Sequence, residues 1–210
     1  MTINDIHTHS NNISHHAIVS LSLAQFDREA PRLCSIGIHP WDSNRVTDHD
    51  LRLLQQLSQH RHVLAIGECG IDCLRGADIE QQTTLFEYHI GLSEMLKKPL
   101  IIHSVKSAHI IISLCKKHKP AQKWIVHGFR GNASTAQQFI NHGIELSFGE
   151  KFNAKAVAIT PIEMLWVESD ESRLCINAIY DLVAHAANIE PHELQKSVEM
   201  RAEKTFLAYE

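Results

Sequence analysis

Residues 63–103 read VLAIGECGIDCLRGADIEQQTTLFEYHIGLSEMLKKPLIIH. Two short apolar runs, Val63–Gly67 and Pro99–Ile102, enclose a segment in which apolar residues between Leu85 and Leu96 recur at helical spacing. Both runs are continuously apolar instead of alternating, which is typical of strands buried on both faces. A strand, a helix and a second strand in this order predict a parallel pair of strands joined by the helix.

The same alternation continues along the whole chain. Six further apolar, β-rich runs are predicted as strands: Thr2–Ile6, His16–Leu23, Leu33–Ile38, Lys123–Val126, Ile144–Phe148 and Leu165–Val167. The other predicted helices are one capped by Thr47, one around Ala108–Cys115, one around Ala136–Ile140 that ends at a left-handed Gly143, and two at about 172–188 and 191–208. Pro191 occupies a favourable first-turn position in the last of these.

Eight strands alternating with helices predict an α/β fold of the (β/α)8 TIM-barrel type. The chain has 210 residues, which is short for this fold, and the spacers between the first three runs are too short for full helices. We therefore expect a shortened barrel with helices missing after the first two strands. Because no repeat, low-complexity tract or linker interrupts the pattern, residues 1–210 are predicted to form a single domain.

The composition favours a globular protein and disfavours a membrane-spanning or non-specific DNA-binding one. Apolar residues make up 44% and charged residues 21% of the chain, as in globular proteins. No apolar run reaches the ~18 residues of a membrane span, and the net charge of −4 disfavours non-specific binding to duplex DNA. Five cysteines without a Cys-x-x-Cys pair predict reduced thiols and a cytoplasmic location. The 16 histidines are an unusually large number, and histidine is the commonest metal ligand.

Histidine and carboxylate side chains stand at the carboxyl ends of the predicted strands. They are His7, His9, His39, Glu68, His103, His127, Glu168 and Asp170. In a parallel barrel these ends share one rim, where active sites are built. His7 and His9, two residues apart on a strand, point to the same side and can reach one cation. A single strand-end histidine is more often structural, but the whole set favours a site for Zn²⁺, Mn²⁺ or Mg²⁺.

The ordered motifs D-x-H-x-H, G-I-H-P, I-G-E-x-G-x-D, P-L-I-I-H, V-H-G-F-x-G and E-S-D resemble those of the TatD family of metal-dependent hydrolases, within the amidohydrolase-like barrels. The resemblance extends from Asp5 to the final helix. It implies a metal-dependent nuclease that acts on DNA as its substrate with one or two divalent ions, Zn²⁺, Mn²⁺ or Mg²⁺.

The resemblance also implies roles for individual residues. The first metal would be held by His7, His9 and Asp170, the second by His103 and His127, and Glu68 would bridge the two. His39 would line the pocket and contact the scissile phosphate or the attacking water. Asp170 would orient that water or take its proton, so the expected catalytic residues are Asp170, Glu68 and His39.

Several motifs depart from the family. Where Ser-Arg usually follows the fifth-strand histidine, residues 103–106 read HSVK, and the usual H-C-F-S-G becomes HGFRG at 127–131. The proline that normally follows E-S-D is absent, as is the loop beyond it that carries an arginine and an asparagine. All ligand positions are kept, whereas the altered residues are expected phosphate and sugar contacts. We expect Lys106 and Arg130 to replace the missing arginine, with Arg130 the better candidate because its planar fork can hold two phosphate oxygens.

Three other side chains have two interpretations each. Trp41 could stack a nucleic-acid base at the rim or simply pack a loop. Asp72 and Glu168 are expected to orient ligand histidines or to bond the backbone.

The leading hypothesis is a cytoplasmic phosphodiester hydrolase, a DNase that trims single-stranded or frayed ends and has no membrane association. One alternative is a small-molecule amide, ester or lactone hydrolase on the same barrel, because fold does not fix substrate. The other is a weakly active or non-catalytic subunit of a nucleic-acid-processing complex, with a protein partner on the shortened flank. A basic groove would favour the nuclease, a closed apolar pocket the small-molecule enzyme, and a large apolar patch the partner.

Overall fold

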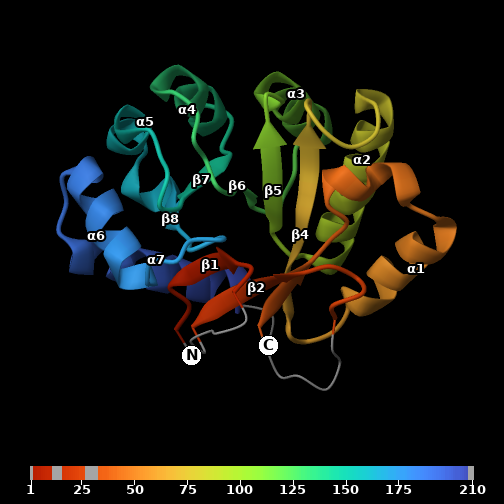
Figure 1. Ribbon diagram of the computed structural model, residues 1–210, viewed down its shortest axis with the longest axis horizontal. Helices are drawn as coiled ribbons and strands as arrows, with labels where there is room; N and C mark the ends of the chain where they lie inside the picture. Colours follow the sequence, from red (N-terminus) through yellow and green to blue (C-terminus); the bar gives the residue numbers. More distant parts are fainter. Residues whose placement is uncertain (1, 11–15, 27–32, 208–210) are drawn as a thin grey trace. The chain divides into compact units, whose positions relative to one another are not determined.

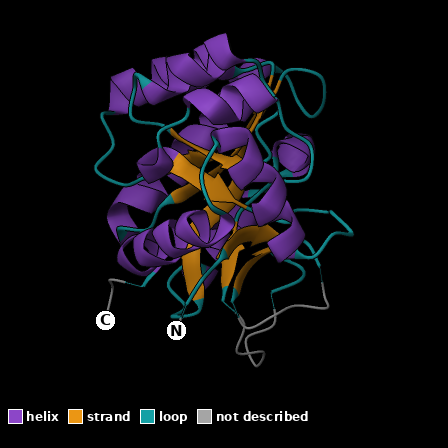
Figure 2. Cartoon of the chain, turned by 90° about the vertical axis from the view of Figure 1, so that its left-hand side faces the viewer, coloured by secondary structure: helices purple, strands orange, loops and turns teal. Residues whose placement is uncertain are grey.

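A computed structural model describes residues 2–10, 16–26 and 33–207. Its eight strands are ordered β1 to β8 in one sheet and alternate with helices along most of the chain (Figures 1 and 2). The chain divides into two compact units. The first unit comprises Met1–Val19 and Ile125–Glu210, and the second unit comprises Ser20–Trp124.

The second unit contains three parallel strands with helices between them. Its elements are β3 (Cys34–Ile36), the 3₁₀ helix η1 (Pro40–Arg45), α1 (Asp48–Leu57), β4 (Val63–Asp72), α2 (Ile79–Leu96), β5 (Leu100–Val105) and α3 (Ala108–His118). Both β3 and β5 pair with β4 in parallel, and α2 packs along β4, as Figure 1 shows. All ten residues of β4 are buried, as the continuous apolar run predicts.

The first unit repeats this pattern. Its elements are β1 (Asp5–Thr8), most of β2 (Ala17–Leu21) and of β6 (Trp124–Val126), α4 (Ala133–Ile140), β7 (Glu145–Phe148), α5 (Ala154–Ile159), the 3₁₀ helix η2 (Ile162–Met164), β8 (Leu165–Val167), α6 (Ile176–Ala187) and α7 (Pro191–Phe206). The parallel pairs are β1 with β2, β6 with β7, and β7 with β8.

Several local signals act as the sequence predicts. Thr47 caps α1, accepting a hydrogen bond from the Asp50 N–H while the Asp50 carboxylate accepts from the Thr47 N–H. Gly143 has a left-handed φ of 72° just after α4, where the Gly143 N–H bonds the Ile140 carbonyl. Pro191 is the first residue of α7. The described residues between β1 and β3 contain no helix, as expected.

The prediction of where β4 and β5 end is wrong. The sequence places Glu68 and His103 at strand ends, but both residues lie inside strands, which continue to Asp72 and Val105. The register between β4 and β5 shifts between Ile66 and Cys69, and pairing then resumes. The shift interrupts the regular pairing at Gly67 and Glu68 without ending the strand.

The predicted start of α6 is also wrong. The helix begins at Ile176 instead of about Ser172. The Ser172 hydroxyl donates to Glu150 and accepts from the Leu174 N–H, so the side chain stabilises a turn that competes with helix. The predicted end of α7 at residue 208 lies outside the described residues. None of the described helices has the length and apolar character required to cross a membrane.

Candidate metal centre

A tight cluster forms in the second unit from His39, Glu68 and His103. His39 lies between β3 and η1, Glu68 in β4 where its register with β5 shifts, and His103 in β5. Glu68 Oε1 lies 3.0 Å from His39 Nε2 and 2.8 Å from His103 Nδ1. One potential ligand atom from each residue lies within 4.8 Å of the others. The two imidazoles and the carboxylate, largely buried, therefore converge on one point.

Asp72 supports this cluster from the opposite side of His103. Asp72 Oδ2 lies 3.3 Å from His103 Nε2 and accepts a 2.6 Å hydrogen bond from the indole N–H of Trp41. Burial raises the pKa of the Asp72 carboxyl, but the hydrogen bonds from Trp41, the Leu74 N–H and His103 outweigh it and hold that pKa below its ordinary value. An ionised Asp72 fixes the His103 ring, with its Nδ1 directed at Glu68.

His89, to which the sequence assigned no role, supports the turn before His39. The buried ring donates from Nδ1 to the Leu85 carbonyl and accepts from the Ile38 N–H at Nε2. Burial lowers the pKa of His89 to about 4, so the ring is neutral and can accept this bond at physiological pH. No sequence motif marks this role, because it depends on α2 lying against the end of β3.

A second cluster forms in the first unit from His7, His127 and Asp170. His7 belongs to β1, while His127 and Asp170 follow β6 and β8. The His7 and His127 ring centroids are 4.2 Å apart, and one potential ligand atom from each of the three residues lies within 4.8 Å of the others. Asp170 Oδ1 lies 3.9 Å from His7 Nε2 and 3.8 Å from His9 Nε2. His9 is therefore also beside this carboxylate.

The backbone holds Asp170 in an unusual conformation. Its φ is 51°, in the left-handed region that few non-glycine residues adopt. The Asp170 N–H bonds the His7 carbonyl at 2.9 Å, and the His9 N–H bonds the Asp170 carbonyl at 3.1 Å. These two bonds fix the carboxylate beside the His-x-His motif of β1.

Glu168 and Asp5 lie behind this second cluster. Glu168 Oε1 accepts from the Gly128 N–H at 2.7 Å and lies 3.4 Å from His127 Nδ1. Asp5 accepts from both the N–H and the hydroxyl of Ser169. Burial nevertheless raises the pKa of Asp5 to about 7, against the lowering effect of the Ser169 hydrogen bonds. Glu168 thus places a carboxylate oxygen beside a ring nitrogen of His127, as Asp72 does beside His103.

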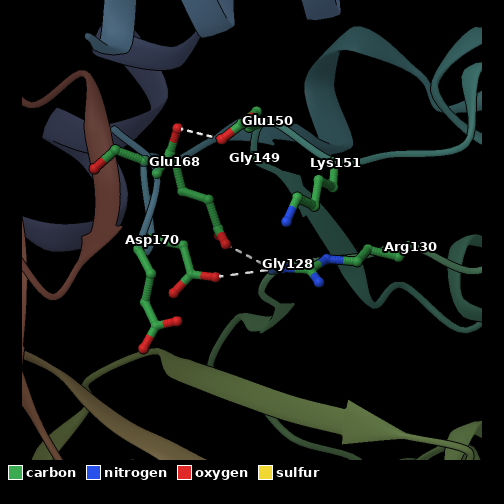
Figure 3. A pocket seen from close by; sticks show the side chains of 10 residues that line it. Gly128, Arg130, Gly149, Glu150, Lys151, Glu168 and Asp170 are labelled. Atoms are coloured by element: carbon green, nitrogen blue, oxygen red, sulfur yellow. Dashed lines mark hydrogen bonds and ion pairs between the residues drawn. The ribbon is translucent and has the colours of Figure 1, made fainter. Parts of the chain in front are cut away.

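A cavity of about 180 Å³ opens beside Asp170 (Figure 3). Its lining includes Arg130, Lys151, Glu168 and Asp170, and one Arg130 nitrogen lies 3.7 Å from Asp170 Oδ2. Figure 3 shows the charged ends of Arg130 and Lys151 turned toward the same space. The sequence predicted Arg130 as a substrate contact but missed Lys151, an exposed loop residue outside every motif.

The other two predicted substrate contacts lie in the second unit. Trp41 is 45% exposed, and its ring centroid is 4.7 Å from that of His39. Lys106 is exposed directly after β5, with a left-handed φ of 52°.

Both clusters suit a divalent cation. Each offers two imidazoles and one carboxylate with no sulfur, a donor set that fits Zn²⁺ or Mn²⁺ and, less well, Mg²⁺. The predicted bridging by Glu68 and the assignment of ligands to individual ions stay predictions.

Parallel strands alternating with helices, carrying histidine–carboxylate clusters, are typical of metal-dependent hydrolases built on TIM-type barrels. The family described as TatD related DNase matches residues 7–207, and the chain belongs to this family.

Relatives with similar sequences have related names. The chain is 28% identical over 166 residues to "Uncharacterized metal-dependent hydrolase YjjV" of Escherichia coli, covering 74% of this chain and 64% of that protein. It is 32% identical over 147 residues to "Uncharacterized metal-dependent hydrolase YabD" of Bacillus subtilis, covering 65% and 57%. It is 30% identical over 129 residues to the "3'-5' ssDNA/RNA exonuclease TatD" of Erwinia tasmaniensis, covering 60% and 49%. The matched region therefore spans about half to two thirds of these relatives' lengths.

Solved structures confirm the fold class. The crystal structure of the E. coli TatD homologue YjjV superposes with a TM-score of 0.80 at 20% identity, covering 98% of this chain and 97% of that one. A TatD-family hydrolase from Entamoeba histolytica gives a TM-score of 0.78 at 16% identity, covering 98% of each chain. The predicted (β/α)8 TIM-type fold is thus confirmed.

Proposed function

We propose that this protein is a divalent-metal-dependent phosphodiester hydrolase that acts on DNA, at single-stranded or frayed ends. The observation that carries the proposal is the pair of histidine–carboxylate clusters, each with ligand atoms from three residues within 4.8 Å. Family membership supports a hydrolase, and the Erwinia relative named as a single-strand exonuclease supports a nucleic-acid substrate.

In this proposal, as the family resemblance implies, His7, His9 and Asp170 would hold the first cation and His103 and His127 the second. Glu68 would be a ligand of both. A bound divalent ion supplies positive charge that attracts phosphate and favours ionisation of water. His39 lines the site through its contact with Glu68.

Other side chains of the site accept a proton, bind the phosphate and contact the base. The Asp170 side chain is 20% exposed, so its Oδ2 can accept the proton of an attacking water. Arg130 beside that oxygen binds a non-bridging phosphate oxygen, and Lys106 adds a second positive charge. Trp41 is 45% exposed, and a base can stack on the part of its ring that Arg75 leaves open.

The decisive experiment incubates purified protein with end-labelled single-stranded, frayed and blunt duplex DNA, with Mg²⁺, Mn²⁺ or chelator. We expect cation-dependent shortening of the single strand and frayed duplex, and little action on the blunt duplex. Glu203→Gln, on the exposed face of α7, is the matched carboxylate control for Asp170→Asn. No cleavage of any DNA with either cation would overturn the proposal.

The cavity beside Asp170 favours a second candidate, a small-molecule hydrolase. Its volume of about 180 Å³ corresponds to about six waters at the ~30 Å³ that each occupies in the liquid, which is room for a small ligand. Its polar and charged lining argues against an apolar substrate. A panel of small amides, esters and lactones tests this candidate, and their turnover without DNA cleavage would favour it.

The proposal includes a cytoplasmic location. The five cysteines are all free thiols, which suits the reducing cytoplasm. A protein partner on the flank of β1 to β3 would be expected if the chain were a weakly active subunit.

A further inference from the structure

Trp41 is held in one orientation although its side chain is 45% exposed. Its indole N–H donates a 2.6 Å hydrogen bond to Asp72 Oδ2. Its ring meets His39 edge-on, with centroids 4.7 Å apart, and lies 6.0 Å from the His103 ring. An exposed aromatic side chain is therefore fixed directly beside the cluster of the second unit.

Arg75 lies on the face of this indole. Its guanidinium carbon is 4.4 Å from the centre of the Trp41 ring, a cation–π distance. A guanidinium on an aromatic face keeps its N–H donors available, and these donors match phosphate oxygens two at a time. Within the described residues, no carboxylate pairs with Arg75. The positive charge of Arg75 is thus held in place without an ion pair to a carboxylate of the described residues.

The loop that carries Arg75 is built rigidly. Gln82 is buried, and its side-chain nitrogen lies 3.0 Å from the Asp72 carbonyl oxygen, 2.8 Å from that of Arg75 and 2.8 Å from that of Ala77. Its oxygen accepts from the Asp72 N–H. One buried amide therefore holds the backbone of Asp72, whose carboxylate anchors Trp41, and the backbone of Arg75.

The same loop is also attached to η1, the element that carries Trp41. The Ser43 hydroxyl donates to the Pro40 carbonyl and accepts from the Ala77 N–H. Gly76 has a left-handed φ of 88°, and a Cβ there would lie 2.1 Å from the Pro40 oxygen. The close approach requires glycine, so the positions of Trp41 and Arg75 are fixed relative to each other.

We propose that Arg75, held on the face of Trp41, binds a phosphate group of the nucleic-acid strand beside the His39–Glu68–His103 cluster. The inference rests on the proposed function and deepens it, because it names an anion-binding residue that no expected motif supplied. Arg75 then fulfils in the second unit the role that Arg130 fulfils in the first.

The test measures binding in chelator, where no strand is cut. A fluorescein-labelled single-stranded oligothymidylate is titrated by anisotropy at several salt concentrations, with inorganic phosphate as competitor in a parallel arm. Arg75→Gln should weaken binding about tenfold at low salt. It should also lower the slope of log K against log salt by about 0.7, the value for one phosphate contact on a single strand. Competition only at phosphate concentrations far above those of the oligonucleotide would identify the strand as the ligand.

Two further variants separate this role from a structural one. Arg75→Lys keeps the charge but lacks the planar fork, and should restore the salt slope while recovering only part of the affinity. Arg52→Gln removes an exposed arginine of α1 and should change neither quantity. Trp124 and Trp166 are buried, so a change in tryptophan fluorescence on adding the oligonucleotide reports mainly on Trp41.

An unchanged slope in Arg75→Gln, or an equal change in Arg52→Gln, would overturn the inference even if the wild-type protein hydrolyses DNA. No binding by the wild-type protein would overturn it as well. Wild-type binding with the expected slope change, but no hydrolysis when cations are added, would support the inference and count against the proposed function.

Discussion

The two histidine–carboxylate clusters are built alike but differ in the histidine distances and the exposure of Glu68 and Asp170. In the second unit Glu68 lies within hydrogen-bonding distance of two imidazoles, at 2.8 and 3.0 Å. In the first unit Asp170 lies 3.8 and 3.9 Å from His9 and His7, outside that distance for these pairs. The Asp170 side chain is 20% exposed and that of Glu68 is 7% exposed, so Asp170 is the more accessible to a water molecule.

The surroundings of the clusters differ as well. Beside Glu68 stand an aromatic ring and a stacked guanidinium, those of Trp41 and Arg75. Beside Asp170 lies a polar cavity with the cations of Arg130 and Lys151. The two units therefore surround their clusters differently, the second unit with an aromatic face and a guanidinium, the first with a charged, polar cavity.

The sharpest test of the comparison is Asp170→Asn. The substitution keeps the shape but removes the negative charge and most of the basicity, so we expect DNA hydrolysis to fall by about two to four orders of magnitude. Steady-state kinetics measures the loss, and an unchanged unfolding midpoint shows that the fold survives. Near-normal turnover would mean that Asp170 is not the general base.

The companion test is Glu68→Gln, in the tight cluster. Loss of a ligand carboxylate should weaken binding of the second cation by roughly 100-fold or more, since even outer carboxylates contribute 10- to 100-fold. Elemental analysis after dialysis measures the metal content. If Glu68→Gln retains the wild-type metal content but loses its activity, the roles of the two carboxylates are reversed.

The two units should also differ in how they respond to acid. The folded pKa of His89 is about 4, below its ordinary value of 6.5, so the unfolded chain takes up a proton first as the pH falls. The stability that neutral His89 contributes is present above pH 6.5 and is lost between pH 6.5 and 4, by about 3 kcal/mol. Asp5, with a raised pKa of about 7, acts oppositely, because its folded form holds a proton that the unfolded chain releases between pH 4 and 7.

Urea unfolding between pH 4 and 7, in chelator, measures both effects. His89→Gln should flatten the loss of stability on acidification, and Asp5→Asn should remove the loss that occurs as the pH rises. The same pH dependence in both variants and the wild type would contradict this assignment.

The carboxylates behind the clusters offer a matched pair of variants. Asp72→Asn should loosen His103, and Glu168→Gln should loosen His127. Each should lower metal affinity by about 10- to 100-fold, with the larger change for Asp72 because Trp41 also depends on it. Calorimetric titration with Zn²⁺ measures the affinities, and equal small effects would mean that neither carboxylate orients its histidine.

Much of this architecture is readable from the sequence. The run Leu165–Val167 is the strand β8 with the same bounds, and Thr47 and Pro191 begin their helices as expected. Expected ligand residues gather in groups of potential ligand atoms, among them His7, His127 and Asp170 in the first unit and Glu68 and His103 with His39 in the second. These features depend on local chemistry or on the shared direction of parallel strands, both of which the sequence carries.

Other features depend on tertiary contacts that cannot be predicted from the sequence pattern. The continuation of β4 to Asp72 arises from pairing with β5 beyond a shift in register. The roles of His89 and Gln82 arise from the position of α2. Arg75 and Lys151 are exposed loop cations without a motif, so only their neighbours in space draw attention to them.

The smallest expected effects concern Arg130 and Lys106, the two cations that we propose replace the missing arginine. Arg130 lies 3.7 Å from Asp170 Oδ2 but is 59% exposed, so solvent weakens its interactions. Arg130→Ala should lower kcat/KM for DNA by roughly 1–3 kcal/mol of transition-state stabilisation, the scale of one charge-assisted contact. Lys106→Ala should lower kcat/KM for DNA by less than Arg130→Ala does, mainly by raising KM. A flexible ammonium binds phosphate without fixing its orientation. Lys155→Ala, an exposed lysine of α5, is the control, and metal content should be unchanged in all three. If the Arg130–Lys106 double variant has wild-type kinetics, neither cation binds the phosphate, and the small-molecule or non-catalytic alternative gains weight.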